Sequence, residues 1–231
     1  MITVRGVDGC PAGWISLSLS PDGGKLLPEI FADAQALLHQ HVDVTAIDIP
    51  IGLSAADARR CDQEARALLG VRKNAVFPAP VRATLAAESY EAACRASEAA
   101  CGRRLSQQTY GILSKIRDVD AELRRSSVLL GCVRELHPEV CFYFWNAKQP
   151  MHHPKKTGFG FMERFRLVEG MFGAAVAEVR DSLPRAQASD DDILDAFAAL
   201  WTAKRIHAGI AERVPALEEC DEFGLPMQMW A

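Results

Sequence analysis

Residues 2–8 (ITVRGVD) and 42–49 (VDVTAIDI) decide the fold, because each is a short β-rich run with an aspartate near its end. Between them, the turn residues GCPAG and PDGG set off two further predicted strands, at 14–19 and 25–30. The first three strands should form an antiparallel meander. Residues 31–40 have helical spacing, so the fourth strand follows a crossover helix and should lie parallel to a strand of the same sheet.

The rest of the chain adds helices and one more strand. Residues at about 54–127 are rich in Ala, Arg, Glu and Leu and predict a helical insertion, and the run 128–136 predicts a buried strand. Pro138 suits the first position of the next helix. The expected fold is therefore α/β: a single domain over 1–231 with a mixed five-stranded sheet flanked by helices. Further helices are expected at 139–145, 161–172 and 189–207, and a loop at 146–160.

Composition favours a soluble globular protein. The 231 residues are 49% hydrophobic and 24% charged, and no stretch of about 18 uninterrupted apolar residues exists. The N-terminus lacks the layout of a signal peptide. Seven cysteines without a CxxC pair predict reduced, mostly buried thiols. We therefore expect a cytoplasmic protein that makes no contact with membranes.

The charges are unevenly distributed along the chain. The formal net charge of −4 argues against a strongly basic nucleic-acid binder. Residues 59–104, however, carry nine Lys and Arg against five Asp and Glu. This basic segment is either the solvated face of a helical insertion or a surface that faces an anionic substrate.

Three carboxylates lie within or at the ends of predicted strands. If the runs that hold Asp8 and Asp48 are neighbours, both side chains emerge at the same edge of the sheet, where open α/β sheets bind ligands. Glu135 lies in the predicted strand 128–136, and a buried carboxylate needs a partner. That partner is either an arginine or a metal ion.

A fourth group of acids opens the last predicted helix. Ser189 and Asp192 form a capping-box pattern, which explains acids in the first turn. Asp195 lies beyond that turn, on the same face as Asp192 and beside the apolar stripe. Hard oxygen ligands from separate elements suit Mg²⁺ or Mn²⁺, and two such ions would support phosphodiester cleavage.

Many ordered motifs along nearly the whole chain resemble a known family. The arrangement of strands and acids is similar to the ribonuclease H-like fold of nucleases, Holliday-junction resolvases and transposases. More closely, the sequence resembles the family of domain of unknown function 429, predicted ribonuclease H-like nucleases. The motifs that carry this resemblance are GVDGCPAGW, IDIPIGL, RRCDQEAR, VFPAPVRATL, KIRDVD, ELHPEVCF and DDILDAFAALWTA.

The resemblance implies a metal-dependent nuclease site. Its catalytic residues and ligands would be Asp8, Asp48, Glu135 and Asp195, with Asp192 as a neighbouring ligand. The motif DDILDA is similar to a resolvase helix that ends in Asp-Ala, which indicates Asp195 as a ligand. The implied cofactor is Mg²⁺ or Mn²⁺, the implied partner is nucleic acid, and the oligomeric state stays open, a homodimer included.

A phosphodiester substrate also needs cations. Lys155 and Lys156, adjacent in a Pro/Gly-rich loop, are the best candidates, because such a loop can close over a phosphate. For any one cation, a solvated helix face or an internal ion pair is the competing interpretation. The other candidate substrate-binding residues are Arg60, Arg66, Arg72, Arg82 and Lys115.

Histidine, aromatic and thiol side chains complete the candidates. His137, two residues after Glu135, is expected on the same strand face as that carboxylate, either for proton transfer or as a structural residue before Pro138. Cys10 has no histidine partner in the pattern, so we reject a nucleophilic role. Four aromatic residues could stack on bases, although most should lie in the core: Trp14, Phe77, Phe142 and Trp145.

Two other functions are weighed against the nuclease. One is a non-catalytic binding or regulatory module that keeps the fold and its acids, which the low positive charge favours. The other is a nucleotide-binding phosphotransferase of the actin type, which GVDGCPAG faintly resembles. That type usually needs two such cores, and this chain has one βββαβ pattern.

Overall fold

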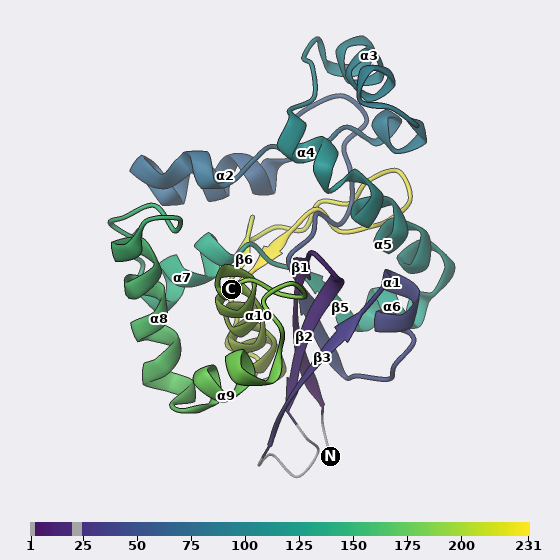
Figure 1. The fold of residues 1–231 in the computed structure, drawn as a ribbon. Coiled ribbons are helices and arrows are strands. Elements are labelled where there is room, and N and C mark those ends of the chain that lie inside the picture. Colours follow the sequence, from purple (N-terminus) through teal and green to yellow (C-terminus); the bar gives the residue numbers. More distant parts are fainter. Residues whose placement is uncertain (1–2, 20–24) are drawn as a thin grey trace.

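The computed structural model describes residues 3–19 and 25–231, and a five-stranded mixed sheet forms its centre (Figure 1). The strand order is β3-β2-β1-β4-β5. Strand β2 is antiparallel to β1 and β3, whereas β4 runs parallel to both β1 and β5. The bounds are β1 Val4–Cys10, β2 Gly13–Leu19, β3 Leu26–Phe31, β4 Val44–Ile47 and β5 Val133–Glu135.

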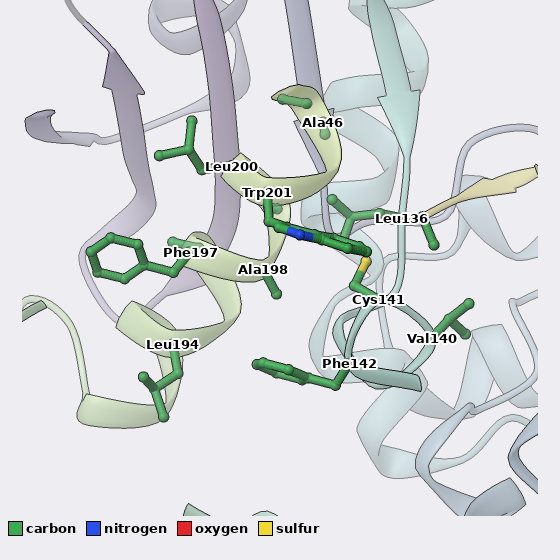
Figure 2. Packing of buried hydrophobic residues seen from close by; sticks show 14 of the residues in the cluster. Ala46, Leu136, Val140, Cys141, Phe142, Leu194, Phe197, Ala198, Leu200 and Trp201 are labelled. Carbon is green, nitrogen blue, oxygen red and sulfur yellow. The ribbon is translucent and has the colours of Figure 1, made fainter. Parts of the chain in front are cut away.

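One face of the sheet is covered by α10 (Asp190–His207), which packs against β1 with almost no side chain between the two backbones. A Cβ atom at Gly6 of β1 would lie 2.0 Å from the backbone nitrogen of Leu200. Glycine is therefore required there, because no side chain fits. The alanines of α10 and Trp201 continue this layer to α7, as Figure 2 shows.

Three further helices flank α10: α7 (Pro138–Trp145), α8 (Gly158–Phe172) and α9 (Ala175–Ser182). Trp145 of α7 stacks on Trp201 of α10 with ring centroids 4.9 Å apart. The capping box between Ser189 and Asp192 starts α10, as expected from the sequence. Pro138 occupies the first turn of α7, also as expected.

The opposite face of the sheet is covered by α1 (Ala34–Leu38), α5 (Leu113–Arg125) and α6 (Ser127–Cys132). Val7 and Ile47 pack here with Leu37 of α1 and Ile116 of α5. Because side chains alternate along a strand, β1 contributes Val7 to this face and Gly6 to the face of α10. The sheet is thus buried on both sides.

The helical insertion lies beyond the edge at which β1 ends (Figure 1). It is divided into more elements than the two or three helices expected. Its elements are α2 Arg60–Leu69, η1 Gly70–Ala75, η2 Arg82–Ala86, α3 Tyr90–Cys101, α4 Gln107–Gly111 and the helix α5.

The C-terminal segment docks on its own chain. Strand β7 (Met229–Trp230) pairs antiparallel with β6 (Arg213–Val214), and Leu225 is buried. The carboxylate of Asp221 accepts a hydrogen bond from the backbone N–H of Leu53 at 3.0 Å. The segment therefore fixes the loop that follows β4.

Two sequence expectations need correction. The run 128–136 is not one buried strand: residues 127–132 form α6, Val128 is 76% exposed, and only Val133–Glu135 pairs with β4. The helix expected at 31–40 is shorter, because β3 continues to Phe31 and Asp33 caps α1. In both places the local apolar pattern fits either a strand or a helix, and tertiary pairing decides between them. No helix within the described ranges is long and apolar enough to cross a membrane.

Candidate functional site

Asp8 and Asp48 lie side by side at the ends of two parallel strands. The register pairs Val7 of β1 with Ile47 of β4, and the N–H of Asp48 donates to the carbonyl of Val7 at 3.0 Å. The next residue on each strand is therefore an aspartate on the same face, with adjacent parallel strands about 4.8 Å apart. Asp8 is buried and Asp48 is half-buried.

Asp195 reaches the same place from α10. It is 3% exposed, and Lys155, from the loop between α7 and α8, pairs with its Oδ2. The charges of Asp48 and Asp195 both act on Asp8. We call Asp8, Asp48 and Asp195 the aspartate site. Its three carboxylates come from β1, β4 and α10, and Asp8 and Asp195 are held by the tight contact at Gly6.

Burial and mutual repulsion make the carboxylates of the aspartate site hard to ionise. Burial raises the pKa of Asp48 to about 6, although the charges of His137 and Lys155 and a hydrogen bond with Asp8 lower it. Burial, followed by the charges of Asp48 and Asp195, holds the pKa of Asp8 well above its ordinary value. Burial also raises the pKa of Asp195, against the opposing charge of Lys155.

The three carboxylates in turn shift the pKa of Lys155. Burial alone would lower its pKa, but the negative charges of Asp195, Asp8 and Asp48 raise it above its ordinary value. The lysine is therefore charged and serves as a counter-ion of all three carboxylates. One lysine does not balance three acids, so the site favours further cations.

His137 lies at the aspartate site, but not in the way the sequence indicated. Strand β5 ends at Glu135, and His137 instead caps α7, where its Nδ1 accepts the N–H of Glu139 at 3.2 Å. Its charge lowers the pKa of both Asp48 and Asp195. The expectation that it shares the strand face of Glu135 was wrong, because the chain leaves the strand before reaching it.

Asp192 stands at the margin of the site. One carboxylate oxygen accepts the N–H of Ser189 at 2.8 Å and so completes the capping box. Its charge still raises the pKa of Asp8. The cap explains its position without a ligand role, and the second oxygen leaves that role open to test.

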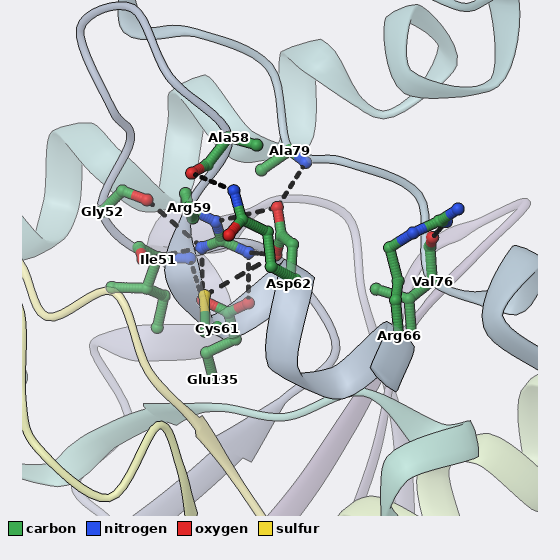
Figure 3. A network of polar contacts seen from close by, with 11 residues as sticks. Ile51, Gly52, Ala58, Arg59, Cys61, Asp62, Arg66, Val76, Ala79 and Glu135 are labelled. Carbon is green, nitrogen blue, oxygen red and sulfur yellow. Dashed lines mark hydrogen bonds and ion pairs between the residues drawn. The ribbon is translucent and has the colours of Figure 1, made fainter. Parts of the chain in front are cut away.

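Glu135 points to the other face of the sheet. The register places it beside Ile47, one residue before Asp48, so its side chain lies on the face of Val7 and Ile47. There it accepts two hydrogen bonds from Arg59, at 2.7 and 2.8 Å, and one from the N–H of Ile51 at 2.7 Å (Figure 3). Of the two partners weighed for this carboxylate, the structure provides the arginine.

Arg59 organises a buried polar cluster around Glu135. Its guanidinium also donates to Asp62 at 2.6 Å and to the carbonyls of Ile51 and Gly52. Cys61, Asp62 and Glu135 each offer one atom within 4.8 Å of the others, a spacing that could hold a metal ion. Arg59 already supplies a positive charge at this position, where its guanidinium contacts both Asp62 and Glu135.

A groove of about 620 Å³ lies next to Lys155. We call it the lysine groove. Asp190 in its wall pairs with Arg185 at 2.8 Å and with Arg180 at 3.1 Å. Lys156 is exposed and forms no hydrogen bond or ion pair with any residue that the structure describes. The lining residues are Lys155, Lys156, Thr157, Gly158, Phe161, Arg185, Ser189, Asp190 and Asp191.

The candidate arginines of the insertion lie away from the aspartate site, and three of the four already contact other groups of the protein. Arg60 pairs with Glu64 and Glu219 on the surface. Arg66 donates to backbone carbonyls, including Val76 at 2.6 Å, and Arg82 is buried with Asp120 and Asp221. Arg72 keeps a buried Nε without a hydrogen-bond partner among the described residues.

Lys115 is nearer to the site than these arginines. Its Nζ contacts the carbonyl of Gly13 and lies 4.6 Å from the ring centroid of Trp14, at the turn between β1 and β2. It approaches Gly9, which alternates with Asp8 and so belongs to the other face. Of the cations proposed from the sequence, only Lys155 has a direct contact with the aspartate site among the described residues.

The aromatic and thiol candidates have mostly structural places. Trp14 and Phe142 are buried, Trp145 packs on the core, and Phe77 is 47% exposed. Burial raises the pKa of the Cys10 thiol, which keeps it from acting as a thiolate. All seven cysteines are free, and four of them are buried.

Sequence reasoning missed two buried arginines. Arg59 belongs to the motif RRCDQEAR, in which Arg60 and Arg66, but not Arg59, were chosen as substrate-binding candidates. Arg164 pairs with Glu139 at 2.6 Å behind Asp195, where the charge of Glu139 raises the pKa of Asp195. No local pattern distinguishes these arginines from solvated ones, because their partners are distant in sequence.

Comparisons with known proteins give one match. Neither the curated proteins nor the solved structures contain a match to this chain. A protein family described as "Protein of unknown function (DUF429)" matches residues 6–219, which include the aspartate site, the lysine groove and the Arg59 cluster. Because the match extends over nearly the whole chain, this protein belongs to the DUF429 family.

Proposed function

We propose that this protein is a metal-dependent nuclease with a ribonuclease H-like fold. The strand order β3-β2-β1-β4-β5, with β2 antiparallel, supports the fold assignment. The observation that carries the function is the aspartate site: three carboxylates from β1, β4 and α10 share one edge of the sheet with too few cations to balance them. Ligand sites of open α/β sheets lie at this edge.

The residues of the aspartate site fit a hard divalent cation. Buried carboxylates whose pKa is raised by one another gain most from a cation that enters between them. Their oxygen atoms suit Mg²⁺ or Mn²⁺ better than zinc. When bound, such an ion supplies polarisation of a phosphoryl oxygen and a more acidic water.

The chain's own residues would divide the remaining work. Asp8, Asp48 and Asp195 would hold the cation, and Lys155 would hold an anionic oxygen of the substrate. His137 accepts the N–H of Glu139 on Nδ1, which leaves its Nε2–H free to donate a hydrogen bond to an oxygen of the substrate. Glu135 has no part in this proposal, because Arg59 engages both of its oxygens.

Thermal unfolding tests the cation site. Mg²⁺ or Mn²⁺ should raise the midpoint of the wild type and not that of Asp8→Asn, because a ligand that binds only the folded state stabilises it. Asp118→Asn is the matched control, since Asp118 is an exposed acid of α5. Equal stabilisation of all three proteins would overturn the proposed site.

Cleavage assays test the reaction itself. Single-stranded, duplex, branched and RNA:DNA hybrid substrates are incubated with Mn²⁺ and the wild type or Asp195→Asn. We expect cleavage of at least one substrate by the wild type only. Metal stabilisation without any cleavage would favour instead a binding module that retains the fold.

A further inference from the structure

Lys155 stands between two different environments. Its ammonium group pairs with the buried carboxylate of Asp195, and its side chain also lines the lysine groove. The lysine side chain is 34% exposed, whereas that of Asp195 is 5% exposed. Lys155 therefore lies between the aspartate site and the lysine groove, and its flexible four-carbon stem gives its ammonium group access to both.

The position of Lys155 on Asp195, its inner position, depends on the charge balance of the aspartate site. In the metal-free chain its ammonium group compensates Asp195 and lowers the pKa of Asp8 and Asp48. A divalent cation at these carboxylates would take over the compensation and repel the ammonium group over a short distance. The divalent cation and the ammonium group of Lys155 therefore compete for the carboxylate of Asp195.

The lysine groove offers an outer position for the ammonium group beside other anion-binding groups. Lys156 has no ion-pair partner in the described ranges, and Arg185 is mostly exposed. The acid Asp190 is already paired with Arg180 and Arg185. The partly exposed ring of Phe161 adds an apolar surface on which a base could stack. This combination fits a nucleotide phosphate with its base.

We propose that Lys155 is an exchangeable counter-ion: it occupies Asp195 in the metal-free protein, and a divalent cation releases it into the lysine groove, where it binds a phosphate of the substrate. This inference rests on the proposed function, because it takes the aspartate site as the cation site. It assigns the lysine groove as the subsite for a nucleotide phosphate. It also couples the two binding events, since the cation frees a group that the phosphate needs.

Calorimetric titration of Lys155→Met tests the exchange. At pH 8, the variant should bind Mg²⁺ about 5-fold or more tightly than the wild type, because the competing ammonium group is gone. The same variant should bind thymidine 5′-monophosphate, titrated in the presence of Mg²⁺, about 5-fold or more weakly. A merely structural lysine would weaken both ligands together.

The neighbouring lysine provides the matched control. Lys156→Met should weaken thymidine 5′-monophosphate and leave the Mg²⁺ affinity unchanged, because Lys156 does not contact the aspartate site. Lys155→Gln serves as a second variant if Lys155→Met does not fold, which circular dichroism reports.

The outcomes separate the two proposals. An unchanged or weaker Mg²⁺ affinity in the folded Lys155 variants overturns the exchange, while the wild-type titration and the cleavage assay still support the nuclease. A wild type that binds no Mg²⁺ overturns the proposed function, and the exchange with it, before any variant is compared. Tighter Mg²⁺ binding with weaker nucleotide binding supports the exchange even if no substrate is cleaved.

Discussion

Substitution of Glu135 by glutamine separates a structural carboxylate from a metal ligand. The side chain keeps its size, but it loses the charge that pairs with Arg59. If Glu135 is structural, the variant should lose stability and keep its response to Mg²⁺. If it is a ligand of the aspartate site, the response to Mg²⁺ should be lost.

The structure sets the magnitude of the stability loss. Both partners are 2% exposed, and the carboxylate accepts hydrogen bonds of 2.7 and 2.8 Å from Arg59 and 2.7 Å from Ile51. Burial raises the pKa of Glu135, and the charge of Arg59 opposes that rise. Breaking a buried pair of this kind costs about 3–5 kcal/mol, because one charge stays buried without its full compensation.

Urea unfolding measures this loss directly. We expect Glu135→Gln to lower the free energy of unfolding by about 3–5 kcal/mol. Glu98→Gln is the control, because Glu98 pairs with Arg104 at 3.9 Å with both side chains more than half exposed, and such surface pairs contribute little. Mg²⁺ should raise the midpoint of Glu135→Gln as much as that of the wild type. Unchanged stability together with a lost response to Mg²⁺ would refute the conclusion that Glu135 lies on the other face of the sheet and has a structural role.

Three more predictions follow from the site and its supports. Asp48 has a pKa of about 6 instead of 3.8, so its ionisation lowers the stability of the metal-free fold by up to ~3 kcal/mol. This loss is absent below pH 4 and complete above pH 7. Urea unfolding at each pH should therefore show that Asp48→Asn gains stability relative to the wild type as the pH rises from 4 to 7. Wild-type Mg²⁺ affinity, measured by calorimetry, should rise with pH through the pKa of Asp48, which is about 6, because a proton must leave before the cation binds; a flat profile would contradict this. Gly6→Ala should lower the free energy of unfolding by about 3 kcal/mol in urea and weaken Mg²⁺ binding, since α10 must retreat about 1.4 Å to restore an ordinary contact; a variant like the wild type would contradict the tight contact.

Much of the sheet could be predicted from the sequence, because its elements carry local signals. Turn residues separate β1 from β2, and the capping box marks the start of α10. The turn predicted at PDGG, residues 21–24, lies outside the described residues. The fifth strand could not be delimited, because the apolar run from Val128 suits a helix or a strand until it meets β4. The insertion was predicted as helical because it has little strand signal, but its division into short helices depends on contacts with distant residues.

The parts of the candidate site that lie at strand ends could be predicted from the sequence. The places of Asp8 and Asp48 follow from two parallel strands in register, and Asp195 from its place beyond the first turn of α10. The orientation of Glu135 could not be predicted, because a shift of one residue in register moves a side chain to the other face. The partner Arg59 lies 76 residues away along the chain, so only the folded structure brings it to Glu135.

The contact at Gly6 also bears on how the protein can change. The spacing between Asp8 and Asp195 depends on two backbones that touch, and not on a layer of side chains whose volumes vary. Replacements elsewhere in the core can alter packing without resizing the space that these carboxylates enclose. Redesign of this site for a larger or smaller ion would therefore have to begin at one glycine two residues before Asp8, rather than at the carboxylates themselves.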